Sequence, residues 1–444
     1  MGLSRHIERL FRAILPGPFG LAVIITFIAA ILSLIVEKQS PVDIGLHWQK
    51  GFWDPAMMVF TIQMALILIL GYSVAVSPPV SKIINRLIDM VNNQTQAIVL
   101  LTVSSMCLGW LNWGLGLLFG AVMARKTAEN FQKRNIPFYF PLLGASGYSG
   151  MLTWHSGLSG SAPLKAAEKN HLRELSDHSI ASLPETLSIS ETILSTQNIF
   201  SFVFLLILAP LVLLLFRKKN KAIDELTPYT NTTHDESKPI GAERFEHSKW
   251  PALFIGGALM VTTMLTLSLD KDTFGPNALN GLFLGFALMV YGSLNNFFKS
   301  VKAGMEGAAA IIIQFPFYFG VMGILKHGGL IETFTQWFVT AGSESSMPFL
   351  IMGSAGLVNF FVPSGGGQWA VQGPLILSIC ESINLPISKG IMAMAYGDQL
   401  TNMLQPFWAL PLLAITGLKA HQVLPYTFLM MIVASLVYVV TLMY

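Results

Sequence analysis

The sequence carries very little charge. Only 11% of its 444 residues are Asp, Glu, Lys or Arg, whereas 53% are hydrophobic and the mean hydropathy is +0.58. A soluble domain carries about 25% charged residues, so a chain this poor in charge cannot cover a soluble globule with a polar surface. We therefore expect the protein to lie in a lipid bilayer.

Cysteines and enzyme motifs are also scarce. The two cysteines, Cys107 and Cys380, lie in apolar stretches and offer neither a disulfide framework nor a metal-ligand spacing. No H-E-x-x-H metal motif, G-x-S-x-G nucleophile motif or basic nucleic-acid motif occurs. The net charge of +3 is ordinary for a membrane protein with basic cytoplasmic loops. We expect no metal, no cofactor and no nucleic-acid partner, and an enzyme or receptor is disfavoured.

Long apolar runs recur through the whole length. They are about 18 to 25 residues long, which matches helices that cross a hydrocarbon core of about 30 Å. The sequence therefore predicts an all-α polytopic membrane protein. Residues 1–18 predict an interfacial amphipathic helix on the cytoplasmic surface. The predicted spanning helices cover residues 19–36, 55–76, 141–163, 193–216, 250–268, 278–298, 307–325, 390–415 and 424–443.

Four of the apolar stretches are interrupted by glycine and polar residues. Residues 97–124 and 347–380 each contain two apolar halves around a polar middle, which predicts re-entrant helical hairpins. Residues 141–163 and 390–415 predict broken transmembrane helices. Interrupted segments in matching places of two halves indicate the binding site of a secondary transporter.

The two halves repeat at a nearly constant spacing. Asn112 and Asn359 are 247 residues apart, and so are Gly150 and Gly397. The span at 307–325 is the fifth after the corresponding span at 55–76, so the two cross the membrane in opposite directions and we expect the repeats to be inverted. The predicted organisation is a first repeat half at 19–216, a cytoplasmic linker at 217–249 and a second repeat half at 250–444.

The basic residues test this topology. With two re-entrant hairpins and a cytoplasmic N-terminus, 19 of the 27 Lys and Arg fall on the inner side and 8 on the outer side. Because basic residues are enriched in cytoplasmic loops, this asymmetry favours a cytoplasmic N-terminus and a periplasmic C-terminus.

The interruptions contain the candidate substrate-binding residues. Glycines let backbone N–H groups approach a ligand closely, and the N-terminus of a half-helix favours an anion, so a small carboxylate is the expected ligand. The alternative is that these small residues only permit close helix packing. The substrate-binding candidates are Ser364, Gly365, Gly366, Gly367, Asn112, Asn359, Ser156, Gly157, Ser159 and Ser161.

Ionisable residues within the spans are rare, and each costs at least ~2.5 kcal/mol at the bilayer centre. Asp398, at the start of the second broken helix, could hold a coupling cation or a proton, or could only cap a helix near the surface. His155 could titrate near neutral pH or remain a neutral hydrogen-bonding ring. With Thr401 and Asn402, these residues are the candidates for the coupling ion.

Five motifs in order resemble the short-chain fatty acid transporters of the AtoE type, within the broader ion transporter superfamily. The resemblance extends from about residue 10 to the C-terminus and implies a bacterial inner-membrane protein that takes up acetoacetate, butyrate or similar acids. It also makes a homodimer plausible. Around His155 the family often has glycine, and at Asp398 glutamate is also found. The motifs are Asn112 to Leu117, Gln314 to Tyr318, Val362 to Trp369, Gln372 to Pro374 and Gln405 to Pro411.

The expected mechanism is symport of a monocarboxylate with H⁺ or Na⁺ through alternating access. Moving an anion inward against a membrane potential costs about 2.3 kcal/mol per 100 mV, and a co-transported cation removes this cost. A cation/proton antiporter on the same scaffold is the alternative, with Asp398 as the exchanging acid. A dense set of intramembrane acids would favour the antiporter, and the sequence lacks one.

Overall fold

The computed structural model describes residues 16–176, 182–217, 241–269, 276–340, 343 and 345–444. Its regular elements are helical, which confirms the all-α prediction. Most of the predicted interfacial helix at 1–18 and of the predicted linker at 217–249 lies outside the described residues. The helices are α2 (Pro18–Val36), α3 (Pro41–Phe52), α4 (Pro55–Val76), α5 (Pro78–Asp89), α6 (Gln94–Leu111), α7 (Trp113–Lys133), α8 (Phe140–Tyr148), η1 (Ser149–Leu152), α9 (Ser161–Ala167), α10 (His171–Leu175), α11 (Thr196–Leu215), α12 (Glu243–His247), α13 (Lys249–Leu269), α14 (Pro276–Tyr291), α15 (Leu294–His327), α16 (Leu330–Thr340), α17 (Met347–Phe361), α18 (Gly365–Ser382), α19 (Ile387–Asn402), α20 (Pro406–Thr416) and α21 (Ala420–Met443).

Within the described residues, seven helices are long and apolar enough to cross a membrane: α2, α4, α6, α11, α13, the second part of α15, and α21. Six of them coincide with predicted spans. The predicted spans at 141–163 and 390–415 are divided into shorter helices, as the interruptions predict, and α14 has only 16 residues. The chain is thus a multi-pass membrane protein.

Two helices, α15 and α3, differ from the sequence prediction. The span predicted at 278–298 ends at residue 291 as α14, and α15 begins at residue 294, well before the span predicted at 307–325. Helix α3 was not predicted, because its 12 residues are mixed in polarity and too short to span. It packs closely on α15: a Cβ added at Gly51 would lie 2.2 Å from the carbonyl oxygen of Phe319, so only glycine fits there.

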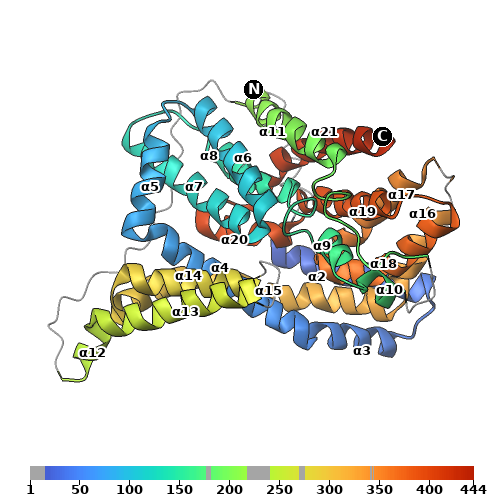
Figure 1. The fold of residues 1–444 in the computed structure, drawn as a ribbon, viewed down its shortest axis with the longest axis horizontal. Helices are drawn as coiled ribbons and strands as arrows, with labels where there is room; N and C mark the ends of the chain where they lie inside the picture. Colours follow the sequence, from blue (N-terminus) through green and yellow to red (C-terminus); the bar gives the residue numbers. More distant parts are fainter. Residues whose placement is uncertain (1–15, 177–181, 218–240, 270–275, 341–342, 344) are drawn as a thin grey trace.

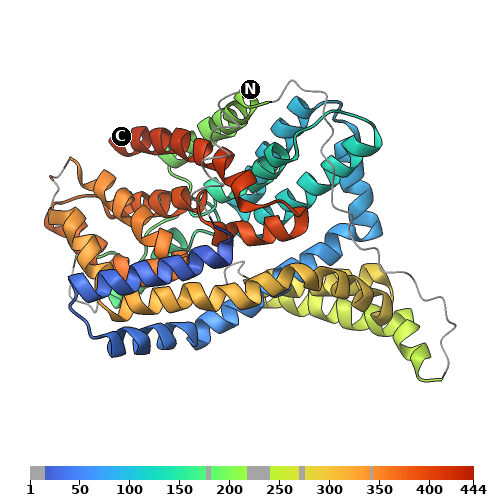
Figure 2. The same cartoon turned by 180° about the vertical axis from the view of Figure 1, so that it is seen from behind.

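The long helices α2, α3, α4 and α15 lie side by side, and α13 and α14 extend this group away from the remaining helices (Figure 1). The helices α5 to α11, with η1, and α16 to α21 form a second group, and the view from behind shows the same division (Figure 2). All four interrupted segments belong to this second group. The interruptions therefore meet in one part of the fold.

Each predicted hairpin consists of two helices around a short extended segment. Asn112 lies between α6 and α7, and its side chain accepts a hydrogen bond from Leu115 N at 3.0 Å, which caps α7. Ser364 caps α18 in the same way, by accepting from Gly367 N at 3.2 Å. Helices α7 and α18 begin 252 residues apart, at 113 and 365. The structural counterpart of Asn112 is therefore Ser364, whereas Asn359 lies one turn earlier, inside α17.

The broken helices pack on the hairpins through matching glycines. A Cβ at Gly150 would lie 2.5 Å from Ser105 O of α6, and a Cβ at Gly397 would lie 2.0 Å from Met352 O of α17. In both halves the helix before the break thus touches the backbone of the first hairpin helix. This shared contact gives a physical reason for the repeated spacing of Gly150 and Gly397.

Candidate functional site

The first break, residues 153–160, has no regular helix and is held by the second half of the chain. The backbone N–H groups of His155 and Ser156 donate to Oε1 of Gln399 at 3.0 and 3.1 Å. Nε2 of Gln399 donates to the Ser156 hydroxyl at 3.2 Å and to the Tyr438 hydroxyl at 2.7 Å. Gln399 was not predicted as a site residue, although it adjoins Asp398 in a polar run. One buried amide of α19 therefore fixes the shape of the first break.

Other contacts tie the same break to the first hairpin. The hydroxyl of Ser159 accepts from Trp113 N at 3.0 Å, and Leu158 N donates to Trp110 O at 2.7 Å. A Cβ at Gly157 would lie 2.2 Å from Trp110 O. Gly157 and the hydroxyls of Ser156 and Ser159 thus shape the break in this structure. Their predicted role in binding substrate stays a prediction.

The second break follows α19, at residues 403–405. Asp398 is fully buried and lies in the last turn of α19, one turn before the break, and not at the start of the broken helix as expected. The carboxylate therefore does not cap a helix N-terminus. It lies near a helix C-terminus, where the dipole disfavours a negative charge and favours a cation.

Asn359 joins α17 to the end of α19. Its Nδ2 atom lies 2.8 Å from Asp398 O, 2.9 Å from the Thr401 hydroxyl and 2.7 Å from Asn402 Oδ1. An amide nitrogen has two hydrogens for these three acceptors. Gln405 completes the connection by donating from Nε2 to Asn359 O at 2.9 Å. The predicted ion-site residues are thus brought together around one hairpin side chain.

His155 comes from the first half of the chain and Asp398 from the second, and their side chains lie next to each other. Nδ1 of His155 lies 3.2 Å from Oδ2 of Asp398, and both side chains are essentially inaccessible to solvent. The two atoms are within ion-pair distance but are not aligned for a hydrogen bond. The other ring nitrogen, Nε2, accepts a hydrogen bond from Ala162 N at 3.2 Å. Because His155 and Asp398 are far apart in the sequence, the sequence did not indicate that they pair.

The tip of the second hairpin lies against the first break. A Cβ at Gly365 would lie 2.7 Å from Cε1 of His155, and one at Gly366 would lie 3.8 Å from the Ser161 hydroxyl. Gly365 is buried, Ser364 and Gly367 are half-buried and Gly366 is exposed, so a small ligand can reach the tip at Gly366. The N–H groups of Gly365 and Gly366 belong to the first turn of α18, which has no internal partner for its donors.

A family model described as short chain fatty acid transporter matches residues 1–444. The chain belongs to this short-chain fatty acid transporter family. A protein of Escherichia coli (strain K12), provisionally named a short-chain fatty acid transporter, is 30% identical over 444 residues, or 99% of this chain and 98% of that protein. A Haemophilus influenzae protein with the same provisional name is 31% identical over 450 residues, with the same two coverages.

Among solved structures, the chain is similar to the YdaH transporter of Alcanivorax borkumensis, with 15% identity and a TM-score of 0.44 over 95% of this chain and 97% of that one. Membership of the short-chain fatty acid transporter family makes this chain a transporter and not an enzyme. Its partners are a small substrate and the lipid bilayer. The described residues contain no group of His, Cys, Asp and Glu that could hold a metal ion.

Three tryptophans lie beside the interruptions of this transporter. The ring centroids of Trp113 and Trp408 are 5.2 Å apart, and those of Trp154 and Trp408 are 6.0 Å apart. Trp154 stacks on the His155 ring with a centroid separation of 4.6 Å. The buried indole N–H groups of Trp154 and Trp408 have no hydrogen-bond partner among the described residues. Such rings can cover a short apolar tail, and their N–H groups can donate to a polar ligand.

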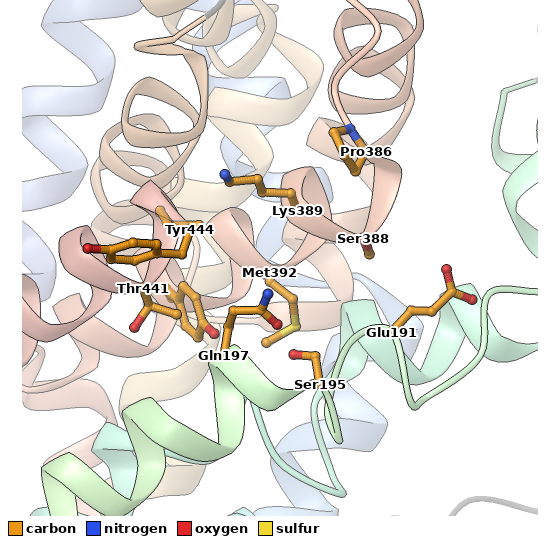
Figure 3. A pocket seen from close by; sticks show the side chains of 11 residues that line it. Glu191, Ser195, Gln197, Pro386, Ser388, Lys389, Met392, Thr441 and Tyr444 are labelled. Carbon is orange, nitrogen blue, oxygen red and sulfur yellow. The ribbon is translucent and has the colours of Figure 1, made fainter.

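A cavity of about 170 Å³ lies between the ends of α11, α19 and α21, with Lys389 and Glu191 in its lining (Figure 3). Tyr396 also lines it. Beneath it, the Tyr396 hydroxyl donates to Asn198 Oδ1 at 3.1 Å, and Asn198 Nδ2 donates to Ser156 O at 2.8 Å. These hydrogen bonds connect Tyr396, which lines the cavity, to Ser156 of the first break. None of the residues that line the cavity is one of the predicted site residues.

Proposed function

We propose that the protein takes up short-chain monocarboxylates, such as acetoacetate or butyrate, by symport with a cation, H⁺ or Na⁺. The observation that carries this proposal is the meeting of the second hairpin tip with the His155 and Asp398 pair. Gly365, at a helix start that favours anions, packs against His155, and His155 in turn lies beside the buried carboxylate of Asp398. Family membership supports the substrate class.

The substrate carboxylate binds at the start of α18. Its oxygens accept hydrogen bonds from the N–H groups of Gly365 and Gly366, with the Ser364 and Ser161 hydroxyls at the sides. The positive end of the helix dipole stabilises the anion, as at other helix N-termini. Gly366 leaves room for the ligand because a Cβ there would approach only the Ser161 side chain.

The short apolar tail lies against neighbouring apolar side chains. Trp154 is in contact distance of a Cβ at Gly365, and the Met322 sulfur is 3.8 Å from a Cβ at Gly367. Trp408 lies beside Trp154. A four-carbon ligand has few atoms, and each contributes at most about 1.5 kcal/mol, so the expected affinity is modest.

The coupling ion binds where α19 ends. Asp398, Thr401 and Asn402 surround Asn359, and His155 approaches from the other half. The end of a half-helix favours a cation. Because one cation neutralises the carboxylate substrate, symport avoids the cost of moving an anion against the membrane potential.

Alternating access follows from an inverted repeat in the inner membrane, with the N-terminus cytoplasmic and the C-terminus periplasmic. Supporting observations are the shared packing of Gly150 and Gly397 and the shared capping at Asn112 and Ser364. In a homodimer, the helices α4, α13, α14 and α15 provide the scaffold, because the interrupted helices lie outside this group (Figure 1).

The test is uptake into proteoliposomes that contain the purified full-length protein. Radiolabelled acetoacetate is added under an inward H⁺ or Na⁺ gradient, with protein-free liposomes to subtract passive entry of the neutral acid. Accumulation above that background, competed by unlabelled butyrate, supports the proposal. Absence of uptake under both gradients, together with absence of exchange between labelled and unlabelled acid, refutes it and favours the antiporter.

A further inference from the structure

We propose that the coupling ion is a proton and that the buried pair of His155 and Asp398 carries it. This inference rests on the proposed symport and names its ion. The pair takes up a proton from the outer solution together with the substrate, and releases it to the cytoplasm after the site opens inward. Its basis is the hydrogen-bonding geometry on both sides of the pair.

The first observation fixes where the His155 ring carries its hydrogen. Nε2 accepts from Ala162 N, so this nitrogen has no hydrogen of its own while that bond exists. A neutral ring therefore has its hydrogen on Nδ1, the atom that lies 3.2 Å from Oδ2 of Asp398. Both atoms are buried and have no other hydrogen-bond partner in the described residues. A small rotation aligns them for proton exchange.

The second observation concerns the oxygen atoms around Asp398. Oδ2 faces Nδ1 of His155, and Oδ1 faces Nδ2 of Asn402 at 3.4 Å. The Thr401 hydroxyl and Asn402 Oδ1 both face the amide nitrogen of Asn359. A hard metal cation requires several oxygens directed at one empty position. Nitrogen atoms occupy the approach to these four oxygens, whereas the nearby oxygens Asn359 Oδ1 and Gln405 Oε1 are buried without a hydrogen-bond partner. Two such oxygens are too few to surround a hard cation, which favours a proton over Na⁺.

Charge couples this proton to the substrate. With a neutral His155 and an ionised Asp398, the site has one negative charge before substrate binds. A substrate carboxylate at Gly365 adds a second negative charge close to the first, and two nearby like charges disfavour each other in a buried site. Uptake of one proton removes this repulsion. Substrate and proton therefore bind best together.

The geometry also provides a mechanical connection. If the imidazole becomes doubly protonated, Nε2 carries a hydrogen and can no longer accept from Ala162 N. Ala162 is in the first turn of α9, next to Ser161, whose hydroxyl faces Gly366 of the hairpin tip. Protonation of the ring thus releases the start of α9 at the place where substrate binds.

Few other titratable groups face the pair. Helix α17 has no acid or base, and the acid of α18, Glu381, accepts from the Ser182 hydroxyl at the outer end of that helix. Lys165 of α9 pairs with Glu168 at the surface. Lys389 of α19 and His421 of α21 are in the first turns of their helices. The remaining groups include the phenols of Tyr148, whose hydroxyl donates to Asn402 O, and Tyr438, whose hydroxyl accepts from Gln399. Neither phenol exchanges a proton near neutral pH.

The experiment compares proton-driven accumulation with exchange in proteoliposomes at a clamped membrane potential. Asp398→Asn imitates a permanently protonated carboxyl group, and His155→Gln removes the ring. Glu381→Gln and His247→Gln make the same chemical changes outside the site and serve as matched controls. Asp398→Glu retains a titratable acid and tests whether the carboxyl group, and not only folding, is required.

We expect a pH gradient to drive accumulation by the wild type, the two controls and Asp398→Glu. In Asp398→Asn and His155→Gln, accumulation falls about tenfold or more because one of the two groups that exchange the proton has been removed. Exchange of labelled for unlabelled acid continues in Asp398→Asn. Accumulation driven by a Na⁺ gradient without a pH gradient would refute the proton as the coupling ion but would leave the proposed symport standing. Full proton-driven accumulation in Asp398→Asn would refute the role of the His155 and Asp398 pair as the proton carrier. If the wild-type protein shows neither uptake nor exchange, the proposed function itself is refuted.

Discussion

Gly365 of the second hairpin packs directly on the ring of His155 in the first break. The ideal position of a Cβ on Gly365 is 2.7 Å from Cε1 of His155 and 2.9 Å from Cη2 of Trp154. This contact joins the two halves of the chain at the point where the helix start, the buried acid and the aromatic side chains meet. Adding one methyl group at Gly365 should therefore displace side chains throughout the site.

Gly365→Ala should reduce uptake strongly. The added methyl group displaces the stacked rings of His155 and Trp154, and overpacking of this kind costs about 1–3 kcal/mol. The measurement is the initial rate of acetoacetate uptake, with Gly257→Ala in α13 as the control, because a Cβ at Gly257 has no neighbour within 4 Å. Equal rates for the two variants would contradict a close contact between the hairpin tip and the break.

Ser364→Ala should weaken substrate binding beyond the loss of a helix cap. The Ser364 hydroxyl caps α18, and loss of a cap costs about 0.5–2 kcal/mol. Ser293→Ala removes the same kind of cap from α15, away from the site. We expect similar losses of thermal stability in the two variants, but a raised KM for uptake only in Ser364→Ala. An unchanged KM in Ser364→Ala would limit this serine to capping.

Asn359→Ala should destabilise the protein and abolish uptake. It removes the amide that holds the Thr401 hydroxyl, Asn402 Oδ1 and Asp398 O. The buried Asn402 Oδ1 thereby loses its donor, which costs about 1–3 kcal/mol. Thermal unfolding of the purified protein checks this prediction. Asn296→Ala is the control, because Asn296 is exposed in the first turn of α15. A variant as stable as the control would show that α17 does not anchor the second break.

The stability of the protein should decrease in mild acid because of His171. Burial lowers the pKa of His171, whose Nε2 accepts a hydrogen bond from the indole N–H of Trp369 in α18 at 3.0 Å. Because the folded protein resists this protonation, the unfolded chain takes up the proton first as the pH falls below about 6.5. The contribution of the neutral ring is thus full above that pH and is lost as the pH falls through the folded pKa. Thermal unfolding at pH 8 and pH 5.5 measures this change, which should be smaller in His171→Gln.

The sequence by itself determined where the chain crosses the membrane and where its helices are interrupted. Apolar runs of spanning length and glycine-rich polar segments are local patterns, so they identify α2, α4, α11, α13 and α21 and all four interruptions from neighbouring residues alone. The motifs around Ser364 and Gln405 also sufficed to indicate the family. Helix α3 was missed because its pattern resembles that of a surface loop segment.

Only the tertiary structure decided which interrupted residues meet. Residues 155 and 398 have no local relationship, and their contact depends on how α19 crosses the first break. The same holds for Gln399, whose amide acquires its role only because the N–H groups of His155 and Ser156 face it. Local periodicity places a residue on a helix or in a break, but contacts across 243 and 244 positions follow from packing between helices.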